Sequence, residues 1–252
     1  MNRLDTIRAV REKLRTGGSS VGSWIQIPHP SIAEIMGHAG YDWVAFDLEH
    51  GAIAVHQLPD LCRALELGGT LPLARLAQGQ VKDCKQALDA GCGGIIAPMV
   101  ESAEQLTRIR DACRWPPAGT RGVGFARGNL FGARFDDYAQ EAQAPLLVAM
   151  IEHRRAVDAL PQIVKVEGLD AILVGPYDLS ASLGRTADFA HPDFEKTMAR
   201  ILEVTRSAGI ACGVHVVTPS PQELQRRQAA GYRFLAYGID SVILNQGARR
   251  PQ

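Results

Sequence analysis

The sequence predicts an α/β fold, a single (β/α)8 TIM barrel over residues 1–252 that is preceded by an extra helix at its amino terminus. Short apolar runs recur along the chain, and amphipathic helical patterns separate them. Eight such strand–helix units fit into 252 residues, which matches the barrel in both number and length. The alternative is an open, doubly wound sheet. The first predicted strand, however, is followed by Pro28-His29-Pro30-Ser31 and not by a GxGxxG turn.

Buried parallel strands are expected to read as continuous apolar runs. The predicted strands are residues 22–27, 43–47, 71–76, 94–98, 146–151, 171–174, 211–216 and 234–237. The predicted helices are the leading one at 4–14 and then 31–38, 58–66, 81–89, 102–114, 155–165, 192–207 and 221–230. Several of these helices end in glycine just before the next strand, where a left-handed residue ends a helix.

The composition excludes several classes of protein. Lys and Arg number 27, and so do Asp and Glu, so the formal net charge is zero and nucleic acid is not an expected partner. The apolar runs are far shorter than a membrane span, and the amino terminus lacks the apolar stretch of a secretory signal. The five cysteines show no CxxC spacing, as is typical of reduced thiols. We therefore expect a cytoplasmic protein.

One segment interrupts the strand–helix rhythm. Residues 115–138 contain five glycines, a Pro-Pro pair and the arginines Arg121, Arg127 and Arg134. Because the segment lies between the fourth and fifth strands, we expect it to hang over the carboxyl-end face of the barrel. A long loop in a compact domain is often functional, and its arginines could hold a substrate carboxylate or a neighbouring subunit. The alternative is a solvated loop.

Glu152 and Asp178 are the candidate metal ligands. Each acid follows a predicted buried strand, and in a parallel barrel the strand ends share the face that carries the site. A shared hard cation, Mg²⁺ or Mn²⁺ with Co²⁺ as a third candidate, would compensate both charges. It would polarise the ketone of a 2-keto acid and stabilise an enolate. Alternatively, the two acids only cap the helices that follow them, for which Asp178 is well placed.

Other polar side chains at the predicted strand ends complete a bowl suited to acid–base chemistry. His50 is the natural base, because imidazole titrates near neutrality. Arg75 is a permanent cation that could hold developing enolate charge. A Schiff-base mechanism would need a lysine in this bowl, but the five lysines lie on predicted helices or before strands. The bowl also receives Gln26, His215, Tyr237 and Asp240.

In order along the chain, several segments resemble the HpcH/HpaI family of class II, pyruvate-dependent aldolases. The resemblance extends from Gly22-Ser23-Trp24 to Gly238-Ile239-Asp240. Each segment alone is weakly specific, but their shared order and spacing are specific. The segments are Phe46-Asp47-Leu48-Glu49-His50-Gly51, Ala74-Arg75, Ala87-Leu88-Asp89-Ala90-Gly91, Ala97-Pro98-Met99-Val100-Glu101, Pro116-Pro117-Ala118-Gly119-Thr120-Arg121-Gly122-Val123-Gly124, Ile151-Glu152 and Gly175-Pro176-Tyr177-Asp178-Leu179-Ser180.

The resemblance implies a barrel of the phosphoenolpyruvate/pyruvate type that assembles as a hexamer, with the last helix exchanged between subunits. It implies that Glu152 and Asp178 hold the metal and that His50 is the base. Asp89 would raise the basicity of His50 through a hydrogen bond, and Arg75 would stabilise the enolate and the transition state.

The resemblance also implies roles for neighbouring residues. Substrate contacts would come from Gly175, Tyr177 and Asp178, the last two offering their backbone to the pyruvate carboxylate. Asp47 and Glu49 would support the base or metal-bound waters.

Two positions depart from the family pattern, and a third is ambiguous. Met150, a predicted substrate contact, stands where several members carry a glutamine that touches the keto acid. Tyr177 is bulkier than the alanine of some members and would narrow the pocket. His153 is expected to begin a helix, although a direct role in the site is an alternative.

These features predict a metal-dependent carbon–carbon lyase. It would reversibly cleave 4-hydroxy-2-oxo acids to pyruvate and an aldehyde through a metal-bound pyruvate enolate. Two alternatives remain open. One is a citrate-synthase-like condensation of an acetyl donor with a keto acid, and the other is a barrel that binds a ligand without catalysis.

Overall fold

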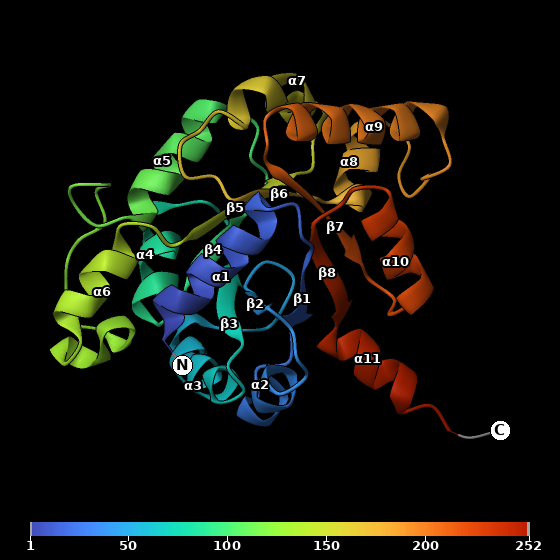
Figure 1. The fold of residues 1–252 in the computed structure, drawn as a ribbon. Helices are drawn as coiled ribbons and strands as arrows, with labels where there is room; N and C mark the ends of the chain where they lie inside the picture. The colour runs from blue at the N-terminus through green and yellow to red at the C-terminus, as the bar shows by residue number, and fades with distance from the viewer. Residues whose placement is uncertain (1, 251–252) are drawn as a thin grey trace.

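The computed structural model describes residues 2–250 and shows a closed barrel of parallel strands (Figure 1). Each strand pairs with the next one along the chain, and β8 closes the barrel by pairing with β1. The TIM barrel predicted from the sequence is therefore confirmed. The strands are β1 (Ser20–Ile25), β2 (Trp43–Asp47), β3 (Leu71–Arg75), β4 (Gly94–Ala97), β5 (Leu146–Ile151), β6 (Ala171–Val174), β7 (Ala211–Val216) and β8 (Phe234–Ile239).

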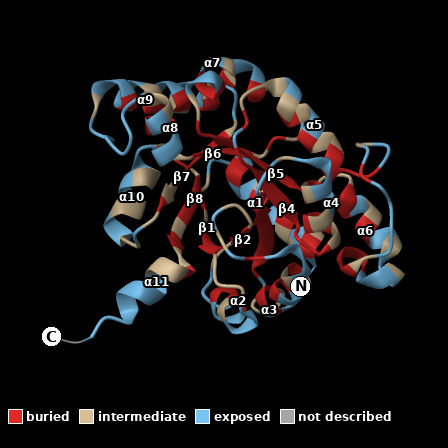
Figure 2. Ribbon diagram, turned by 180° about the vertical axis from the view of Figure 1, so that it is seen from behind, coloured by how far each residue is buried: buried red, intermediate tan, exposed pale blue. Residues whose placement is uncertain are grey.

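Helices surround this barrel, and their outer faces are exposed while the strands are buried (Figure 2). Those predicted from the sequence are α1 (Arg3–Arg15), α2 (Pro30–Gly37), α3 (Leu58–Leu67), α4 (Val81–Asp89), α5 (Ala103–Cys113), α7 (Arg154–Ile163), α9 (Pro192–Ser207) and α10 (Pro221–Ala229). The others are η1 (Val55–Gln57), η2 (Arg127–Gly132), α6 (Phe135–Ala142), α8 (Pro176–Ser182) and α11 (Asp240–Gly247), which extends away from the barrel (Figure 1).

The amino-terminal end of the barrel is closed by α1. The buried side chains of this helix, Ile7, Val10 and Leu14, belong to the same apolar cluster as the residues inside the barrel. Trp43 and Phe234, the first residues of β2 and β8, stack in that cluster with ring centroids 4.3 Å apart. Because this end is filled, the carboxyl ends of the strands form the open face of the barrel.

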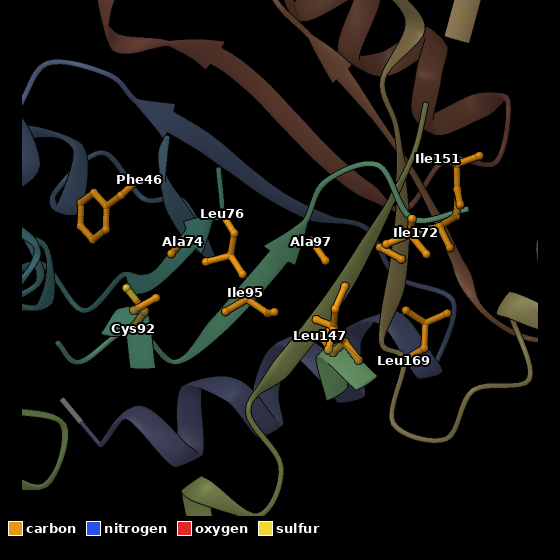
Figure 3. Packing of buried hydrophobic residues seen from close by; sticks show 14 of the residues in the cluster. Phe46, Ala74, Leu76, Cys92, Ile95, Ala97, Leu147, Ile151, Leu169 and Ile172 are labelled. Carbon is orange, nitrogen blue, oxygen red and sulfur yellow. The ribbon is translucent and has the colours of Figure 1, made fainter. Parts of the chain in front are cut away.

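A larger apolar cluster lies between the outer face of the strands and the helices. Figure 3 shows part of it, with Ile95, Leu147 and Ile172 projecting from β4, β5 and β6. Burying apolar surface stabilises the fold by roughly 25 cal/mol per Å². Since the strands carry apolar residues on both faces, they read as continuous apolar runs in the sequence.

The predicted position of segment 115–138 is wrong. The segment follows α5, which runs back down the outside of the barrel, so it lies at the amino end and not over the carboxyl-end face. It is not simply a solvated loop either, because Arg121 is 1% exposed and η2 and the start of α6 fall within it. Two of its arginines, Arg121 and Arg127, are buried and join ion pairs at the amino end, whereas Arg134 makes an exposed pair with Asp137. We call Arg3, Glu66, Arg121, Arg127, Tyr138 and Glu141 the amino-end cluster.

Two further expectations can be compared with the fold. All five cysteines are buried and free, as the absence of CxxC spacing suggested. Over residues 2–250, no helix combines the length and the apolar character that crossing a membrane would require.

Candidate active site

A cavity of about 320 Å³ opens at the carboxyl ends of the strands. We call it the site cavity. It brings together most of the side chains that the sequence singled out, although these come from separate strands. The predicted residues that line it are Gln26, Asp47, His50, Arg75, Met150, Glu152, Gly175, Tyr177, Asp178 and His215.

Glu152 follows β5 and is 4% exposed. Its Oε2 accepts a hydrogen bond from the backbone N–H of Met99, at 2.9 Å. Burial, together with the negative charges of Glu49 and Asp178, raises the pKa of Glu152 to about 7. The carboxylate thus lies in a position where its charge is poorly compensated by the protein itself.

The backbone on both sides is shaped around this carboxylate. A Cβ atom at Gly175 would lie 2.4 Å from Glu152 Oε1, so only glycine fits there. Met99, which donates the hydrogen bond, has a φ of 47°, a conformation that non-glycine residues rarely adopt. A strained residue and an obligatory glycine beside one acid are typical of a functional site.

Asp178 lies in the first turn of α8 and is exposed. Within residues 2–250 its carboxylate takes part in no hydrogen bond or ion pair. The helix-capping interpretation of the two acids is therefore wrong: the N-cap of α8 is Gly175, and the N-cap of α7 is His153, whose side chain accepts from Arg155 N. His153 begins a helix, as expected.

The two carboxylates fit a divalent cation that keeps open coordination positions. Their oxygens are the donors that hard cations prefer, and the raised pKa of Glu152 shows a buried acid that lacks a positive partner. Over residues 2–250, no three His, Cys, Asp or Glu side chains gather closely enough to enclose an ion on their own. Such a cation would therefore leave coordination positions for water or substrate.

Arg75, at the end of β3, is fixed on two sides. Its Nε and NH2 donate to the two oxygens of Asp47 at 2.9 and 2.5 Å, and its guanidinium carbon lies 4.6 Å from the centre of the Trp24 ring. Although burial raises the pKa of Asp47, the hydrogen bonds and charge of Arg75 outweigh it and hold this pKa below its ordinary value. Asp47 is thus a permanent anion that sets the plane of the guanidinium.

Glu49 and His50 occupy the loop after β2. Glu49 Oε2 lies 3.2 Å from Arg75 NH1 and 3.9 Å from His50 Nε2, but it is buried without a hydrogen bond. Burial raises the pKa of Glu49 despite the nearby cation. The His50 side chain is 61% exposed, so it faces solvent and can exchange protons with a substrate that enters the cavity.

Asp89 does not reach His50 within the chain, in contrast to the expected hydrogen bond. It is the last residue of α4, and the carboxyl ends of the surrounding helices lie at the amino end of the barrel. There its Oδ1 accepts a hydrogen bond from Arg121 NH1 at 3.2 Å. The sequence already placed Asp89 at the end of the predicted helix 81–89, which in the predicted barrel lies at the amino end, so a contact with His50 of the same chain conflicts with the predicted topology.

The site cavity also has walls that the sequence prediction did not assign a role. Trp24 supports Arg75, yet in the sequence it is only one apolar residue in a strand. Burial lowers the pKa of His215 to about 4, so this residue is a neutral wall at physiological pH, and its Nε2 lies 3.1 Å from Gly238 O. None of the five lysines lines the cavity, which agrees with the absence of a Schiff-base lysine.

Comparison with known proteins gives a consistent result. Residues 20–246 match the family described as HpcH/HpaI aldolase/citrate lyase. The hydroxypyruvate/pyruvate aldolase of Roseobacter denitrificans is 36% identical over 96% of the chain and 94% of its own length. The 2-keto-3-deoxy-L-rhamnonate aldolase of Salmonella gallinarum is 36% identical over 94% of the chain and 88% of its own length.

The fold of the chain also matches solved structures. A HpcH/HpaI aldolase/citrate lyase family protein from Burkholderia cenocepacia superposes with a TM-score of 0.89 at 32% identity, covering 96% of each chain. The citrate synthase SbnG superposes with a TM-score of 0.80 at 30% identity, covering 94% of this chain and 93% of its own.

Proposed function

Because the chain belongs to the HpcH/HpaI aldolase/citrate lyase family, we propose that it is a class II aldolase that reversibly cleaves 4-hydroxy-2-oxo acids to pyruvate and an aldehyde. It is a carbon–carbon lyase. The observation that carries the proposed mechanism is the buried, poorly compensated Glu152, which shares one cavity with Asp178, Arg75 and His50.

We propose that Glu152 and Asp178 hold a divalent cation, Mg²⁺, Mn²⁺ or Co²⁺. When bound, this ion supplies the Lewis acid that polarises the substrate ketone. The Glu152 carboxylate is already fixed by Met99 N and by the space that Gly175 leaves. It can therefore bind the ion without first having to be ordered.

The chain's own residues would then carry the proton and the charge. His50 takes the proton of the 4-hydroxyl group, the C3–C4 bond breaks, and its electrons pass into the enolate of pyruvate while the aldehyde leaves. The enolate is then protonated at C3 and released as pyruvate. Arg75, held by Asp47, presents its remaining nitrogen NH1 near the cavity and stabilises the developing negative charge. Glu49 lies between Arg75 and His50 and supports both.

Substrate contacts are proposed from α8 and β5. The first-turn N–H groups of a helix lack partners inside it, so those of Tyr177 and Asp178 can bind the pyruvate carboxylate. Met150 lines the cavity with a side chain that cannot donate a hydrogen bond. Arg75 and these amides would therefore hold the keto acid beside the proposed cation, without a side-chain hydrogen bond from the Met150 position.

The test is pyruvate release from a racemic 4-hydroxy-2-oxo acid before and after EDTA treatment, with Mg²⁺, Mn²⁺ and Co²⁺ added back. Activity that is lost with the chelator and restored by metal supports the proposal. Activity that survives EDTA contradicts the metal mechanism. His50→Ala should reduce kcat by about 10²- to 10⁴-fold, as expected for a general base. His38→Ala, which removes an exposed imidazole at the end of α2, serves as the matched control.

A second candidate is a citrate-synthase-like condensation of an acetyl donor with a keto acid. It is favoured by one observation, the superposition with the citrate synthase SbnG. Release of free coenzyme A from an acetyl thioester and oxaloacetate would support it. Pyruvate release without any reaction of the thioester would exclude it. A barrel that only binds a ligand would bind metal and keto acid but turn over neither substrate.

We also propose that the enzyme is a cytoplasmic homo-oligomer, with a hexamer as the expected state. The five free thiols support the location. The projecting α11, with Ile243 and Leu244 exposed, supports an exchange of this helix between subunits. Light scattering of the intact chain and of a variant truncated before α11 would test the assembly.

A further inference from the structure

The Asp47 carboxylate accepts hydrogen bonds from several parts of the protein, and Arg75 is only one of its partners. Its Oδ1 accepts from Arg75 Nε and from the backbone N–H groups of Glu49 and His50, at 2.9, 3.1 and 3.0 Å. Its Oδ2 accepts from Arg75 NH2 at 2.5 Å and from Gln26 Nε2 at 2.9 Å. The carboxylate is therefore held by the loop that carries the base, by the arginine, and by one side chain from β1's carboxyl end.

The amide of Gln26 has only one orientation that satisfies its neighbours. Asp47 is an anion that can only accept, so the NH₂ group of Gln26 must face it. The carbonyl oxygen of Gln26 then faces Ser241, whose hydroxyl donates to it at 2.9 Å. A flipped amide would place two acceptors against each other, and the loss of the Ser241 hydroxyl would leave the carbonyl without this donor.

Ser241 is the second residue of α11, and Asp240 fixes both ends of this contact. The Asp240 carboxylate is 4% exposed and accepts from the backbone N–H groups of Gln26, Ile27 and Ser241 at 2.9, 2.9 and 2.7 Å. The start of α11 and the end of β1 are thus tied together at the rim of the site cavity. From here a row of hydrogen-bonded side chains leads into the cavity: Ser241, Gln26, Asp47 and Arg75.

This row of side chains ends at Arg75, whose guanidinium has one nitrogen, NH1, that Asp47 does not bind. Nε and NH2 of Arg75 are engaged by Asp47, so NH1 is left for Glu49 and for the cavity. Because a bidentate carboxylate sets the plane of a guanidinium, a rotation of Asp47 would turn NH1 away. Among residues 2–250, Gln26 supplies the one side-chain hydrogen bond to Asp47 that does not come from Arg75 itself.

We propose that Gln26, oriented by Ser241, is a positioning residue that fixes Asp47 and so aims Arg75 NH1 at the reacting oxygen, which makes the start of α11 part of the catalytic apparatus. The inference rests on the proposed aldolase function for its kinetic test only. Gln26 does not contact the bond that breaks. It affects the rate by fixing the position of Arg75 in the transition state.

The kinetic test compares Gln26→Met, which keeps the length of the side chain and removes both of its hydrogen bonds, with the wild-type chain. We expect kcat to fall by about 10- to 100-fold, the value of a hydrogen bond to a charged group, and KM for the keto acid to change less than about twofold. Gln143→Met is the matched control. Gln143 also makes two side-chain hydrogen bonds, to Pro116 O and Ala118 N, but at the amino end of the barrel.

The hydroxyl of Ser241 provides a rescue experiment. Ser241→Ala should lower kcat by about fivefold, since it removes one neutral hydrogen bond, and Ser241→Thr, which keeps a hydroxyl, should restore most of it. Ser220→Ala, which removes the cap of α10 away from Asp47, should lower stability without lowering kcat. Equal kcat values for the wild type, Gln26→Met and Ser241→Ala would overturn the inference.

A crystal structure of Gln26→Met tests the inference without turnover. The expected result is a rotated Asp47 carboxylate and an Arg75 whose NH1 has left Glu49. An Asp47–Arg75 pair unchanged from the wild type would overturn the inference, whatever the activity. A displaced pair in the variant, together with a wild-type chain that itself releases no pyruvate, would support the positioning role while contradicting the proposed function.

Discussion

The barrel has a cluster of charged side chains at each end, and the two clusters differ in how completely they are paired. In the amino-end cluster, Arg3 contacts both Glu66 and Glu141, and Arg127 contacts Glu66 as well. Each carboxylate there has an arginine. In the site cavity, Glu152 accepts one hydrogen bond, from a backbone N–H group, and Asp178 accepts none within residues 2–250.

This difference separates a structural from a functional use of buried charge. A buried pair that is complete needs nothing from outside and holds segments together, here α1, α3 and α6. An incomplete set remains costly until a cation or a substrate compensates it. We therefore expect changes at the amino end to affect stability and changes in the site cavity to affect activity.

The largest expected effect is that of Glu152→Gln. This change keeps the shape and the hydrogen bond from Met99 N but removes the charge that would bind the cation. We expect kcat/KM to fall by about 10³- to 10⁴-fold, consistent with the several kcal/mol that a Lewis acid supplies. The metal-free variant should nevertheless unfold at a higher temperature than the metal-free wild type above pH 7, because the uncompensated charge is gone.

Steady-state kinetics and calorimetry on the same preparations would check both parts. The comparison fails if the variant loses stability and activity together, because Glu152 would then belong to a closed, structural set like that at the amino end.

The next largest effect is expected at the other end of the barrel. Arg3→Met removes the arginine that donates to Glu141 at 2.5 Å and leaves this buried acid without its partner. Breaking a buried pair in this way costs about 3–5 kcal/mol in the free energy of unfolding. At a temperature where the variant is folded, kcat should stay within about twofold of the wild type, since α1 lies far from the site cavity.

Arg8→Met is the control for this prediction. Arg8 is on the same helix, and its pair with Asp5 is exposed, with side chains 61% and 64% accessible. Exposed pairs contribute about 0–1 kcal/mol, so denaturant titration should separate the two variants clearly. Equal losses in the free energy of unfolding would show that the buried Arg3–Glu141 pair contributes no more than an exposed pair.

The pH dependence of stability sharpens the same contrast. In the metal-free protein the pKa of Glu152 is raised from 4.5 to about 7, so the folded state binds the proton more tightly than the unfolded chain does. Stability is therefore lost as the pH rises from about 4.5 to 7, by up to about 3 kcal/mol. Saturating Mg²⁺ or the Glu152→Gln change should remove this fall. Urea titrations at pH 5 and 8 would measure this fall in the metal-free wild type, the Mg²⁺-saturated wild type and Glu152→Gln. An equal fall in all three samples would exclude Glu152 as its source.

The sequence predicted the barrel well because its signals are local. Each buried strand is a short apolar run, and the closure of parallel strands alone is enough to bring Glu152, Asp178, His50 and Arg75 to one face. Their convergence did not depend on details of packing. The roles assigned to them remain predictions that the experiments above address.

Where the sequence prediction failed, it misassigned an end of the barrel that the predicted order of strands and helices already fixed. Segment 115–138 comes after α5, which had already returned the chain to the amino end, and Asp89 is at the end of a helix that runs the same way. The short α8 was expected only as the helix that Asp178 would cap, because its sequence PYDLSAS has no apolar period long enough to define its bounds. The pairing of Gln26 with Asp47 joins the ends of the neighbouring strands β1 and β2, but it depends on side-chain orientation and therefore has no signal in the sequence pattern.

The smallest expected effect concerns Met150, which is 4% exposed and lines the site cavity. In the amino-end cluster each carboxylate already has an arginine partner. In the site cavity a new polar side chain meets a substrate that still has acceptors to satisfy. Met150→Gln should therefore lower KM for pyruvate in the synthetic direction by about three- to tenfold, equivalent to one hydrogen bond. It should also lower the stability of the empty enzyme by about 1 kcal/mol, because the amide is then buried without a partner. Initial rates over a range of pyruvate concentrations, with the aldehyde saturating, would measure KM. An unchanged KM together with the full loss of stability would show that this wall of the cavity does not touch the keto acid.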